Sequence, residues 1–326
     1  MQVVTFGELL LRLDTPGHER FVQARELLAR YTGAEANVAV ALAQWDVQTF
    51  VVSRVPAHEI GQACLNELRR FGVNTDGVVR GGQRLGLLFV ETGASQRASS
   101  VIYDRRHSSF GEAQPRDFDW NVLLAGKDWL HLSGTAPALG ANVVDVLHDA
   151  LETARRLHVP VSFDCNYRNT LWSLDEARAV LPALLKQVAV FVGSPHDAGQ
   201  LFDIAGTPAE SAEELRRRFG FRCVGLTLRE GESATVSRLS GLVADASGSH
   251  VSRAYEMQVV DRIGGGDAFT AGLIFGLASG WAADRVAEFA TAASCLKHSI
   301  PGDFNLVSLD EVQRLVDTGS AGPVRR

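Results

Sequence analysis

Strand-like and helix-like segments alternate along most of this chain, and this alternation restricts its fold more than any other feature. Short apolar runs of strand length recur between longer segments with apolar residues at helical spacing. The expected strands are Val3–Leu13, Thr49–Val55, Asp128–Ser133, Val159–Asn166, Val188–Gly193 and Cys223–Leu228. The expected helices are Ala36–Trp45, Ile60–Phe71, Val143–Leu157, Leu174–Gln187, Ala282–His298 and Ser308–Val316. The pattern predicts an α/β fold, with a mostly parallel sheet covered by helices on both faces.

Two regions interrupt the alternation. Leu85–Glu91 and Ser99–Arg105 have the composition of strands, and Thr92-Gly-Ala-Ser95 between them is typical of a hairpin. Asp14–Tyr31 is polar and has little helical periodicity. We therefore expect residues 14–33 and 85–105 to form a small accessory β-sheet, and residues 1–13, 34–84 and 106–326 to form the main α/β domain. An ordinary surface hairpin is the alternative.

The composition argues against several classes of protein. The chain has 326 residues, of which 46% are hydrophobic and 21% charged, so it is long enough for one large core. Its net charge is −6, and the short run Arg216-Arg217-Arg218 is most simply a solvated helix face, so we expect no nucleic-acid partner. The longest mainly apolar stretch, Ala268–Ala283, is too short to span a bilayer.

Cysteine spacing and the first residues indicate a cytoplasmic location. The chain has four cysteines, Cys64, Cys165, Cys223 and Cys295, which lie far apart without a C-x-x-C pair. This spacing favours reduced, mostly buried thiols. The chain opens directly on strand-like residues, which leaves no room for a signal peptide. The terminal Arg325-Arg326 is expected to fray.

The segment Asp261-Arg-Ile-Gly-Gly-Gly-Asp267 carries the clearest chemical signal. Its three glycines leave backbone N–H groups unshielded, and they run into Ala268–Leu277, whose apolar composition suits a buried helix. The N-terminus of such a helix presents free N–H donors and a partial positive charge to an anion. Asp267 fits the N-cap position of that helix. Phosphoryl transfer needs such donors around the transferred group, and a base for the attacking hydroxyl.

Two plainer interpretations compete with a catalytic one. The glycines could form only a tight turn between a strand and a helix, with Asp267 as a capping residue. They could also bind a dinucleotide, but their spacing is not G-x-G-x-x-G and no glycine fingerprint follows the first strand. This disfavours a nicotinamide-dependent dehydrogenase. The spacing is not that of a P-loop either.

The pattern Asp-x-x-Gly-x-Gly-Asp before a small, apolar helix resembles the C-terminal motif of ribokinase-like carbohydrate kinases, the phosphofructokinase-B family. Gly265 stands where that family usually has alanine. The resemblance implies that Asp267 is the base that activates the substrate hydroxyl, and that the N–H groups of Gly264, Gly265 and Gly266 hold the transferred phosphoryl group. Asp261 would help to shape the phosphate and cation region. The resemblance also implies a ribokinase-like fold in which the accessory sheet is a lid over the sugar.

Further segments resemble the members of this family that phosphorylate 2-keto-3-deoxygluconate. They are Tyr31–Ala39, Tyr103–Arg106, His131–Leu139, Asp164–Trp172 with its N-Y-R-x-T-L-W pattern, and Leu296–Asn305 with its P-G-D-F-N pattern. The resemblance implies that the substrate contacts are Gly33, Ala34, Asn37, Tyr103, Arg105, Arg168 and Asp303. A second tyrosine that some sugar-acid kinases place on the first lid strand is absent, because Leu87-Leu88 stands near that position.

Elementary chemistry also favours an acid as the substrate. A carboxylate is best held by forked guanidinium groups, and Arg105 and Arg168 would supply two, although a single arginine is more often a surface residue. The expected reaction is ATP-dependent phosphorylation of 2-keto-3-deoxygluconate to its 6-phosphate. A kinase for another sugar, such as 2-keto-3-deoxygalactonate or fructose, is one alternative. A sugar-acid sensor without catalysis is another, against which the retention of Asp267 and the three glycines argues.

The donor that the resemblance implies is ATP with Mg²⁺. The Asn-x-x-Glu pair of ribokinase relatives corresponds to Ser194-Pro-His-Asp197, so Asp197 is the candidate metal ligand and Ser194 a candidate nucleotide contact. Thr227-Leu-Arg229-Glu-Gly231 keeps only part of the glycine-rich form that contacts the nucleotide in relatives. The nucleotide-binding candidates are therefore Ser194, Thr227, Arg229, Gly231, Gly264 and Gly266. The sequence does not show whether a monovalent cation also binds near the glycines. The exposed edge of the lid sheet favours a homo-oligomer formed through the lid.

Overall fold

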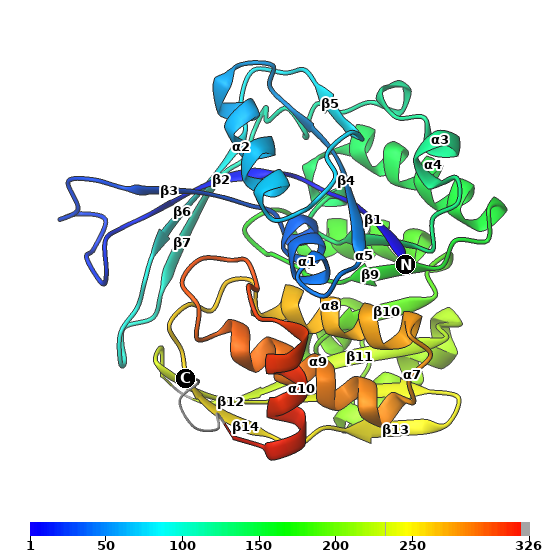
Figure 1. The fold of residues 1–326 in the computed structure, drawn as a ribbon. Coiled ribbons are helices and arrows are strands. Elements are labelled where there is room, and N and C mark those ends of the chain that lie inside the picture. The colour runs from blue at the N-terminus through cyan, green and yellow to red at the C-terminus, as the bar shows by residue number, and fades with distance from the viewer. Residues whose placement is uncertain (232, 321–326) are drawn as a thin grey trace.

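The main sheet of the computed structural model contains ten strands among the residues that the structure describes, 1–231 and 233–320. In chain order these are β1 (Gln2–Phe6), β4 (Gln48–Val55), β5 (Val78–Arg80), β8 (Trp129–Ser133), β9 (Val161–Asp164), β10 (Val190–Gly193), β11 (Cys223–Glu230), β12 (Val236–Asp245), β13 (Gly248–Val251) and β14 (Tyr255–Gln258). Their spatial order is β13-β12-β11-β10-β9-β8-β1-β4-β5, with β14 also paired to β12 (Figure 1). The strands from β5 to β11 pair in parallel, and β12 to β14 add antiparallel pairs. The mostly parallel α/β sheet is therefore confirmed.

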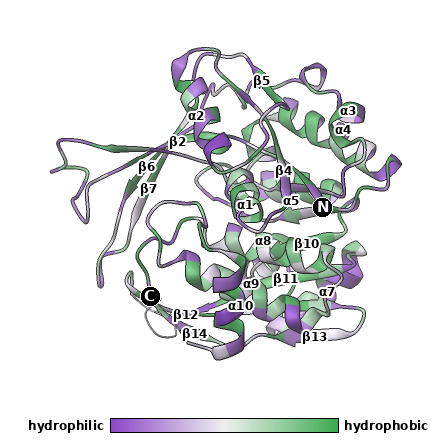
Figure 2. Ribbon diagram, viewed as in Figure 1, coloured by the Kyte–Doolittle hydropathy of each residue, from purple (hydrophilic) through white to green (hydrophobic). Residues whose placement is uncertain are grey.

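Helices cover both faces of this sheet. On one side lie α1 (Ala34–Ala43), α8 (Gly265–Ala278), α9 (Ala283–Lys297) and α10 (Leu309–Thr318), and α2 (Glu59–Arg70) packs near β4. On the other lie α3 (Trp120–Leu124), α4 (Ala141–Arg156), α5 (Leu174–Leu185), α6 (Pro195–Phe202) and α7 (Pro208–Phe219), with short 3₁₀ turns at Pro115–Asp117 and Pro137–Leu139. Alternate strand residues enter the two cores: Phe191 packs with the second set of helices, and Val190 and Val192 with the first. Hydrophobic residues predominate in α8, whereas the outlying α2 is mainly hydrophilic (Figure 2).

A second, smaller sheet projects from the body of the molecule (Figure 1). Its strands are β2 (Leu10–Asp14), β3 (Leu28–Thr32), β6 (Gly86–Glu91) and β7 (Ser100–Asp104), in the order β3-β2-β6-β7. The expected hairpin is confirmed, because β6 and β7 pair antiparallel. The single strand expected over Val3–Leu13 is wrong. Pairing stops after Phe6 and resumes at Leu10, so β1 belongs to the main sheet and β2 to the small one.

A close contact with α1 lies at the break between β1 and β2. Gly7 lies against the carboxylate of Glu35, where a Cβ at this position would stand only 1.9 Å from a Glu35 oxygen. The missing side chain lets α1 approach the end of β1. The apolar run itself is continuous through Leu13, so the sequence pattern had no signal for a change of sheet.

Close packing of α8 on α9 fixes the position of the glycine motif. Gly272 touches α9, since a Cβ there would stand 2.7 Å from the Cα of Ala290. The four cysteines are free, and Cys64, Cys165 and Cys223 are buried, as expected. Among the described residues, no helix has the length and apolar character needed to cross a membrane. Arg325 and Arg326 lie outside the described residues.

Candidate active site

A cavity of about 680 Å³ lies at the carboxyl ends of the parallel strands, between the main sheet, the small sheet and the start of α8. This is where open α/β sheets bind ligands. The structure brings most of the predicted site residues together here: Gly33, Ala34, Asn37, Tyr103, Arg105, Arg168, Ser194, Asp197, Thr227, Arg229, Gly264, Gly266, Asp267 and Asp303 all line the cavity. Two predicted residues, Gly231 and Gly265, do not line it.

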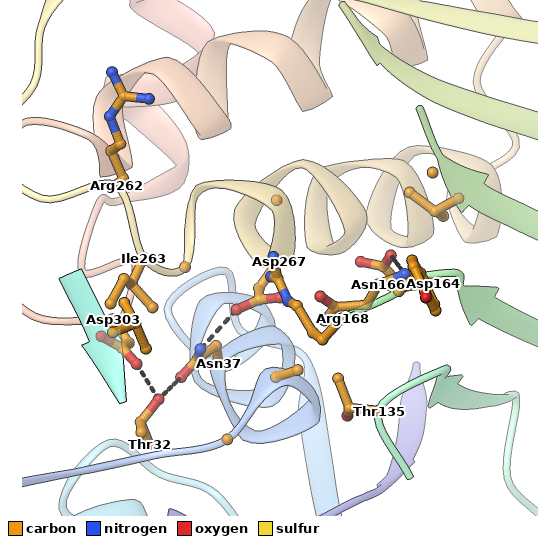
Figure 3. A pocket seen from close by; sticks show the side chains of 18 of the residues that line it. Thr32, Asn37, Thr135, Asp164, Asn166, Arg168, Arg262, Ile263, Asp267 and Asp303 are labelled. Carbon is orange, nitrogen blue, oxygen red and sulfur yellow. Dashed lines mark hydrogen bonds between the residues drawn. The ribbon is translucent and has the colours of Figure 1, made fainter. Parts of the chain in front are cut away.

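Asp267 lies in the first turn of α8, and the expectation that it caps the helix is wrong. The N-cap is Gly264, so Asp267 is the third helical residue. Its carboxylate is buried and accepts a hydrogen bond of 2.6 Å from Nδ2 of Asn37 on α1 (Figure 3). The side chain is therefore aimed at the cavity and held from a second helix.

The surroundings of Asp267 keep its pKa close to neutrality. Burial raises the pKa of Asp267 to about 6, because it disfavours the charged form. The hydrogen bond from Asn37 and the charges of Arg168 and Lys297 act in the opposite direction. A carboxyl with such a pKa can accept a proton from a hydroxyl and release it again near pH 7.

The glycine motif divides into groups that face the cavity and one that does not. Gly264 has a φ of 84°, and a Cβ there would stand 1.9 Å from the carbonyl oxygen of Asp303, so only glycine fits. Gly264 and Gly266 line the cavity. Gly265 instead donates its N–H to the carbonyl of Arg262 at 3.3 Å and lies against the ring of His298. The expected contact between Gly265 and the transferred group stays a prediction.

The sugar-side residues come from α1, β7 and the loop after β9. Gly33 is the N-cap of α1, and a Cβ there would stand 2.4 Å from the carbonyl oxygen of Glu8, so a glycine is required. Ala34 and Asn37 follow on the first turns of the helix. Tyr103 reaches the cavity from β7.

The two predicted arginines have different surroundings. Arg105 is buried and forms an ion pair with Glu8, whose other carboxylate oxygen accepts from Ser108. Its charge is thus already neutralised within the protein, which the sequence did not reveal. Among the described residues, Arg168 has no hydrogen-bond or ion-pair partner for its guanidinium, and it extends toward Asp267 (Figure 3). Arg168 is the arginine that is available to an anionic ligand.

Asp303 lines the cavity, but its carboxylate is engaged by neighbouring side chains. One oxygen accepts from Arg12 and the other from Oγ1 of Thr32, which in turn contacts Asn37 (Figure 3). Arg12 also binds Asp14 and Asp261. The sequence did not single out Arg12 or Thr32, because their partners are far away along the chain. Asp303 is thus first of all a structural partner of Arg12.

Carboxylates also gather at the ends of β9 and β10. Asp164 ends β9 and accepts from Oγ1 of Thr270 at 3.2 Å, and Asp197 closes a capping box with Ser194 at the start of α6. Burial, and then the charges of Asp267 and Asp197, raise the pKa of Asp164 to about 7. An aspartate at the end of a buried strand is the sequence signal by which Asp164 could be found.

These carboxylates suit a cation that takes most of its ligands from elsewhere. Within the described residues, no group of three or more His, Cys, Asp or Glu could hold a metal ion. Mg²⁺ usually binds one or two carboxylates and takes its other ligands from water and substrate phosphates. The pair Asp164 and Asp197 fits that pattern, and the unbalanced charge at Asp164 favours a nearby cation.

Two cationic side chains, those of Arg229 and Arg262, line the end of the cavity beside β11. Thr227 donates to the carbonyl of Gly193 at 3.4 Å, and Arg229 follows two residues later on the same strand. Arg262 lies beside the glycine motif and donates to the carbonyl of Ser233. Gly231 packs against Ser237 of β12, away from the cavity.

Comparison with known proteins places this site in a family. The family model described as pfkB family carbohydrate kinase matches residues 1–305. The chain belongs to the pfkB family of carbohydrate kinases. The 2-dehydro-3-deoxygalactonokinase of Haloferax volcanii is 32% identical over 321 residues, which cover 98% of each chain. It follows that the protein is an enzyme, a sugar kinase of the pfkB family, and kinases of this family use ATP.

Solved structures of pfkB kinases have the same fold. A 2-dehydro-3-deoxygluconokinase from Thermotoga maritima superimposes with a TM-score of 0.95 and 44% identity, over 97% of this chain and 99% of that one. A protein from Escherichia coli described as a ribokinase II, solved in complex with ATP and Mg²⁺, has a TM-score of 0.84 at 21% identity, over 97% and 99% of the two chains. The ribokinase-like fold, with its main α/β sheet and small separate sheet, is therefore confirmed.

Proposed function

We propose that this pfkB kinase transfers the γ-phosphoryl group of ATP to the terminal hydroxyl of 2-keto-3-deoxygluconate, also called 2-dehydro-3-deoxygluconate, to form its 6-phosphate. The observation that carries this proposal is the pairing, in one cavity, of a buried carboxylate at a helix N-terminus with an uncommitted guanidinium. Asp267 supplies the first and Arg168 the second. A kinase for a neutral sugar needs the carboxylate but has no use for the guanidinium.

In this mechanism Asp267 accepts the proton of the terminal hydroxyl as its oxygen attacks phosphorus. Asn37 orients the carboxylate through its 2.6 Å hydrogen bond. The backbone N–H groups of Gly264 and Gly266, together with the positive end of α8, stabilise the charge that develops on the transferred group. The small sheet acts as a lid that excludes water, which limits hydrolysis of ATP.

The sugar acid is held mainly by Arg168, with Tyr103, Gly33, Ala34 and Asn37 around its hydroxyl groups. Arg105 contributes less charge than expected, since Glu8 already neutralises it. Because Asp303 is bound to Arg12, its contribution to the substrate pocket is chiefly to shape the wall.

Asp164 and Asp197 would hold Mg²⁺, directly or through water, with Ser194 near the nucleotide. When bound, the ion neutralises charge on the phosphate oxygens. The capping box with Ser194 uses one oxygen of Asp197, so the other, which accepts from Nε2 of Gln200 at 3.3 Å, is the one that a ligand would contact.

A second candidate is the epimeric substrate 2-keto-3-deoxygalactonate. The similarity to a protein named 2-dehydro-3-deoxygalactonokinase favours it. The two sugar acids differ in the configuration of one hydroxyl, which is distinguished by local hydrogen bonds.

The test is ATP- and Mg²⁺-dependent release of ADP with 2-keto-3-deoxygluconate, 2-keto-3-deoxygalactonate, fructose and ribose. We expect turnover with the sugar acids, the higher kcat/KM with the gluconate form, and loss of turnover in Asp267→Ala. Phosphorus NMR of the product identifies the phosphorylated carbon. Turnover with neutral sugars alone would refute the sugar-acid assignment and leave the kinase class intact. No turnover with any of the four would point to the sensor instead.

A further inference from the structure

We propose that His298 is a positioning residue that holds the guanidinium of Arg229, the nucleotide-binding candidate on β11, in place for the phosphates of the donor nucleotide. The inference rests on the kinase function proposed above and extends it to two residues outside the catalytic motif. Arg229 lies on β11 at the cavity wall, and His298 follows α9 in the interior of the protein.

The hydrogen bonds of His298 determine which ring nitrogen carries the proton. Nε2 lies 3.1 Å from Nη2 of Arg229, and Nδ1 lies 2.6 Å from the carbonyl oxygen of Ser294. A guanidinium can only donate, so Nε2 must accept. A carbonyl can only accept, so Nδ1 must carry the proton. His298 is therefore a neutral imidazole whose lone pair is directed at Arg229.

The neighbours of His298 keep it in this neutral state. Burial lowers the pKa of His298 to about 4, and the charges of Arg229, Lys297 and Arg262 act in the same direction, against the hydrogen bond to Ser294. The ring therefore remains an acceptor for Arg229 throughout the neutral pH range.

The space for the imidazole ring is provided by Gly265. A Cβ at this position would stand 2.2 Å from Cε1 and 2.7 Å from Nε2 of His298. Alanine, which relatives usually have here, cannot coexist with the ring as it is placed. The departure from the family motif at Gly265 and the arginine in the Thr227–Gly231 segment are thus joined by one side chain, His298.

Within the described part of the chain, the positive charge on this wall has no carboxylate as counterion. Among the described residues, neither Arg229 nor Arg262 forms an ion pair with a carboxylate. Both line the cavity, as do Gly264 and Gly266 of the glycine motif. With one edge of its guanidinium fixed by His298, Arg229 keeps its remaining N–H donors for the cavity. A polyphosphate is the ligand class that such a pair of cations beside unshielded N–H groups would bind.

Variants of His298 separate positioning from packing. His298→Phe keeps a ring beside Gly265 but removes the acceptor, whereas His298→Gln keeps an acceptor. The backbone carbonyl of His298, which accepts from the N–H groups of Val260 and Asp261, is preserved in both variants. We expect His298→Phe to raise the KM for ATP about tenfold, because the loss of one hydrogen bond to a charged group weakens binding by about that factor. The KM for the sugar acid should stay unchanged, and His298→Gln should retain most of the affinity for ATP.

Matched controls exist on the neighbouring strands. Arg238→Ala removes an exposed arginine of β12 that pairs with Glu230, and His250→Ala removes a histidine of β13. Neither residue lines the cavity, so both variants should behave as the wild type. Arg229→Ala should weaken ATP at least as much as His298→Phe. Gly265→Ala should be harmful alone and much less so in a His298→Ala background, since the clash is then removed.

Calorimetric titration of MgADP without sugar distinguishes failure of this inference from failure of the proposed function. Weaker MgADP binding in Arg229→Ala and His298→Phe, with unchanged melting temperature, would support the inference. Wild-type ATP and ADP affinity in folded His298→Phe would overturn the positioning role, and the same result in Arg229→Ala would overturn phosphate binding. If the wild-type protein neither binds MgADP nor turns over a sugar, the proposed function itself is wrong.

Discussion

At the scale of single residues, the site is dominated by buried carboxylates with raised pKa values. Burial raises the pKa of Glu35 to about 7 and that of Asp267 to about 6. Burial is also the main cause of the raised pKa of Asp164, which is about 7. The charge of Asp267 contributes to the raised pKa of both other groups. Burial disfavours the ionised state of Asp267, which suits this residue to the role of base proposed above, near neutral pH.

The pH dependence of catalysis should report this environment. Asp267 accepts a proton only when ionised, so kcat/KM should fall as the pH drops below about 6. Asn37→Ala removes a donor that stabilises the ionised form, so the acid limb should move to higher pH. The measurement is a pH–rate profile of both proteins at saturating ATP. An acid limb that stays at the same pH in Asn37→Ala would contradict the role given to this hydrogen bond.

The two arginines should differ in what they do for the sugar acid. Arg168→Ala removes an uncommitted guanidinium, so we expect the KM for the sugar acid to rise about tenfold or more while the KM for ATP stays the same. Arg105→Ala leaves the buried Glu8 carboxylate without its cation, so this variant should also lose stability. Arg178→Ala, on the exposed side of α5, is the matched control. Equal effects of Arg168→Ala and Arg178→Ala on the sugar acid would remove the basis for an acid substrate.

At the scale of elements, one buried arginine connects the small sheet to the catalytic loops. Arg12 of β2 binds Asp14 on its own strand, Asp261 at the start of the glycine motif, and Asp303 in the loop after α9. The carboxylate of Asp261 also accepts from the N–H of Gly302 at 3.0 Å. The base of the small sheet and the glycine motif are therefore held by the same side chain.

Replacement of Arg12 should lower the stability of the protein. Arg12→Ala would leave three aspartates together without their buried cation, and we expect a loss of about 3–5 kcal/mol in the free energy of unfolding. Arg20→Ala is the control, because Arg20 is exposed where it meets Glu91 and should cost less than about 1 kcal/mol. Urea denaturation at pH 7 measures both. Similar losses in the two variants would show that the Arg12 cluster is not a structural centre.

At the scale of the whole molecule, the small sheet has a second face that the protein itself leaves open. Val101 and Tyr103 of β7 face the cavity, whereas Ile102 between them is 52% exposed on the opposite side. Leu28 on β3 is also exposed, but on the other side of the sheet, in register with Val101. Apolar residues on a projecting sheet favour contact with a second copy of the chain, so we expect a homo-oligomer formed through this sheet.

A charged residue introduced on the open face of the small sheet tests that expectation. Ile102→Glu should lower the mass found by sedimentation equilibrium to that of the monomer, because burying the new carboxylate in an interface is unfavourable. Val122→Glu, at a 70% exposed position on α3, should leave the mass unchanged. A wild-type protein that is already monomeric, or an Ile102→Glu variant of unchanged mass, would rule out this interface.

Local patterns were enough to predict the elements and many residues that line the cavity. Alternating periodicity indicated the parallel sheet and composition the β6–β7 hairpin, whereas the resemblance to ribokinase-like kinases indicated Arg168 and Thr227, which line the cavity. The sequence patterns gave wrong predictions where the structure depends on contacts between residues that are distant along the chain. The apolar run through Leu13 hid a change of sheet, and the position of Asp267 within α8 depended on where the helix begins.

The α/β architecture and the glycine-aspartate motif could be predicted from the amino-acid sequence, since periodicity and motif spacing are properties of neighbouring residues. Which charges are available to a ligand became clear only from the fold. Arg12 and Asp303 are separated by 291 positions, and Arg105 and Glu8 by 97. No spacing rule can pair residues so far apart. Whether an arginine meets a substrate or another side chain depends on the folded surroundings that neutralise its charge.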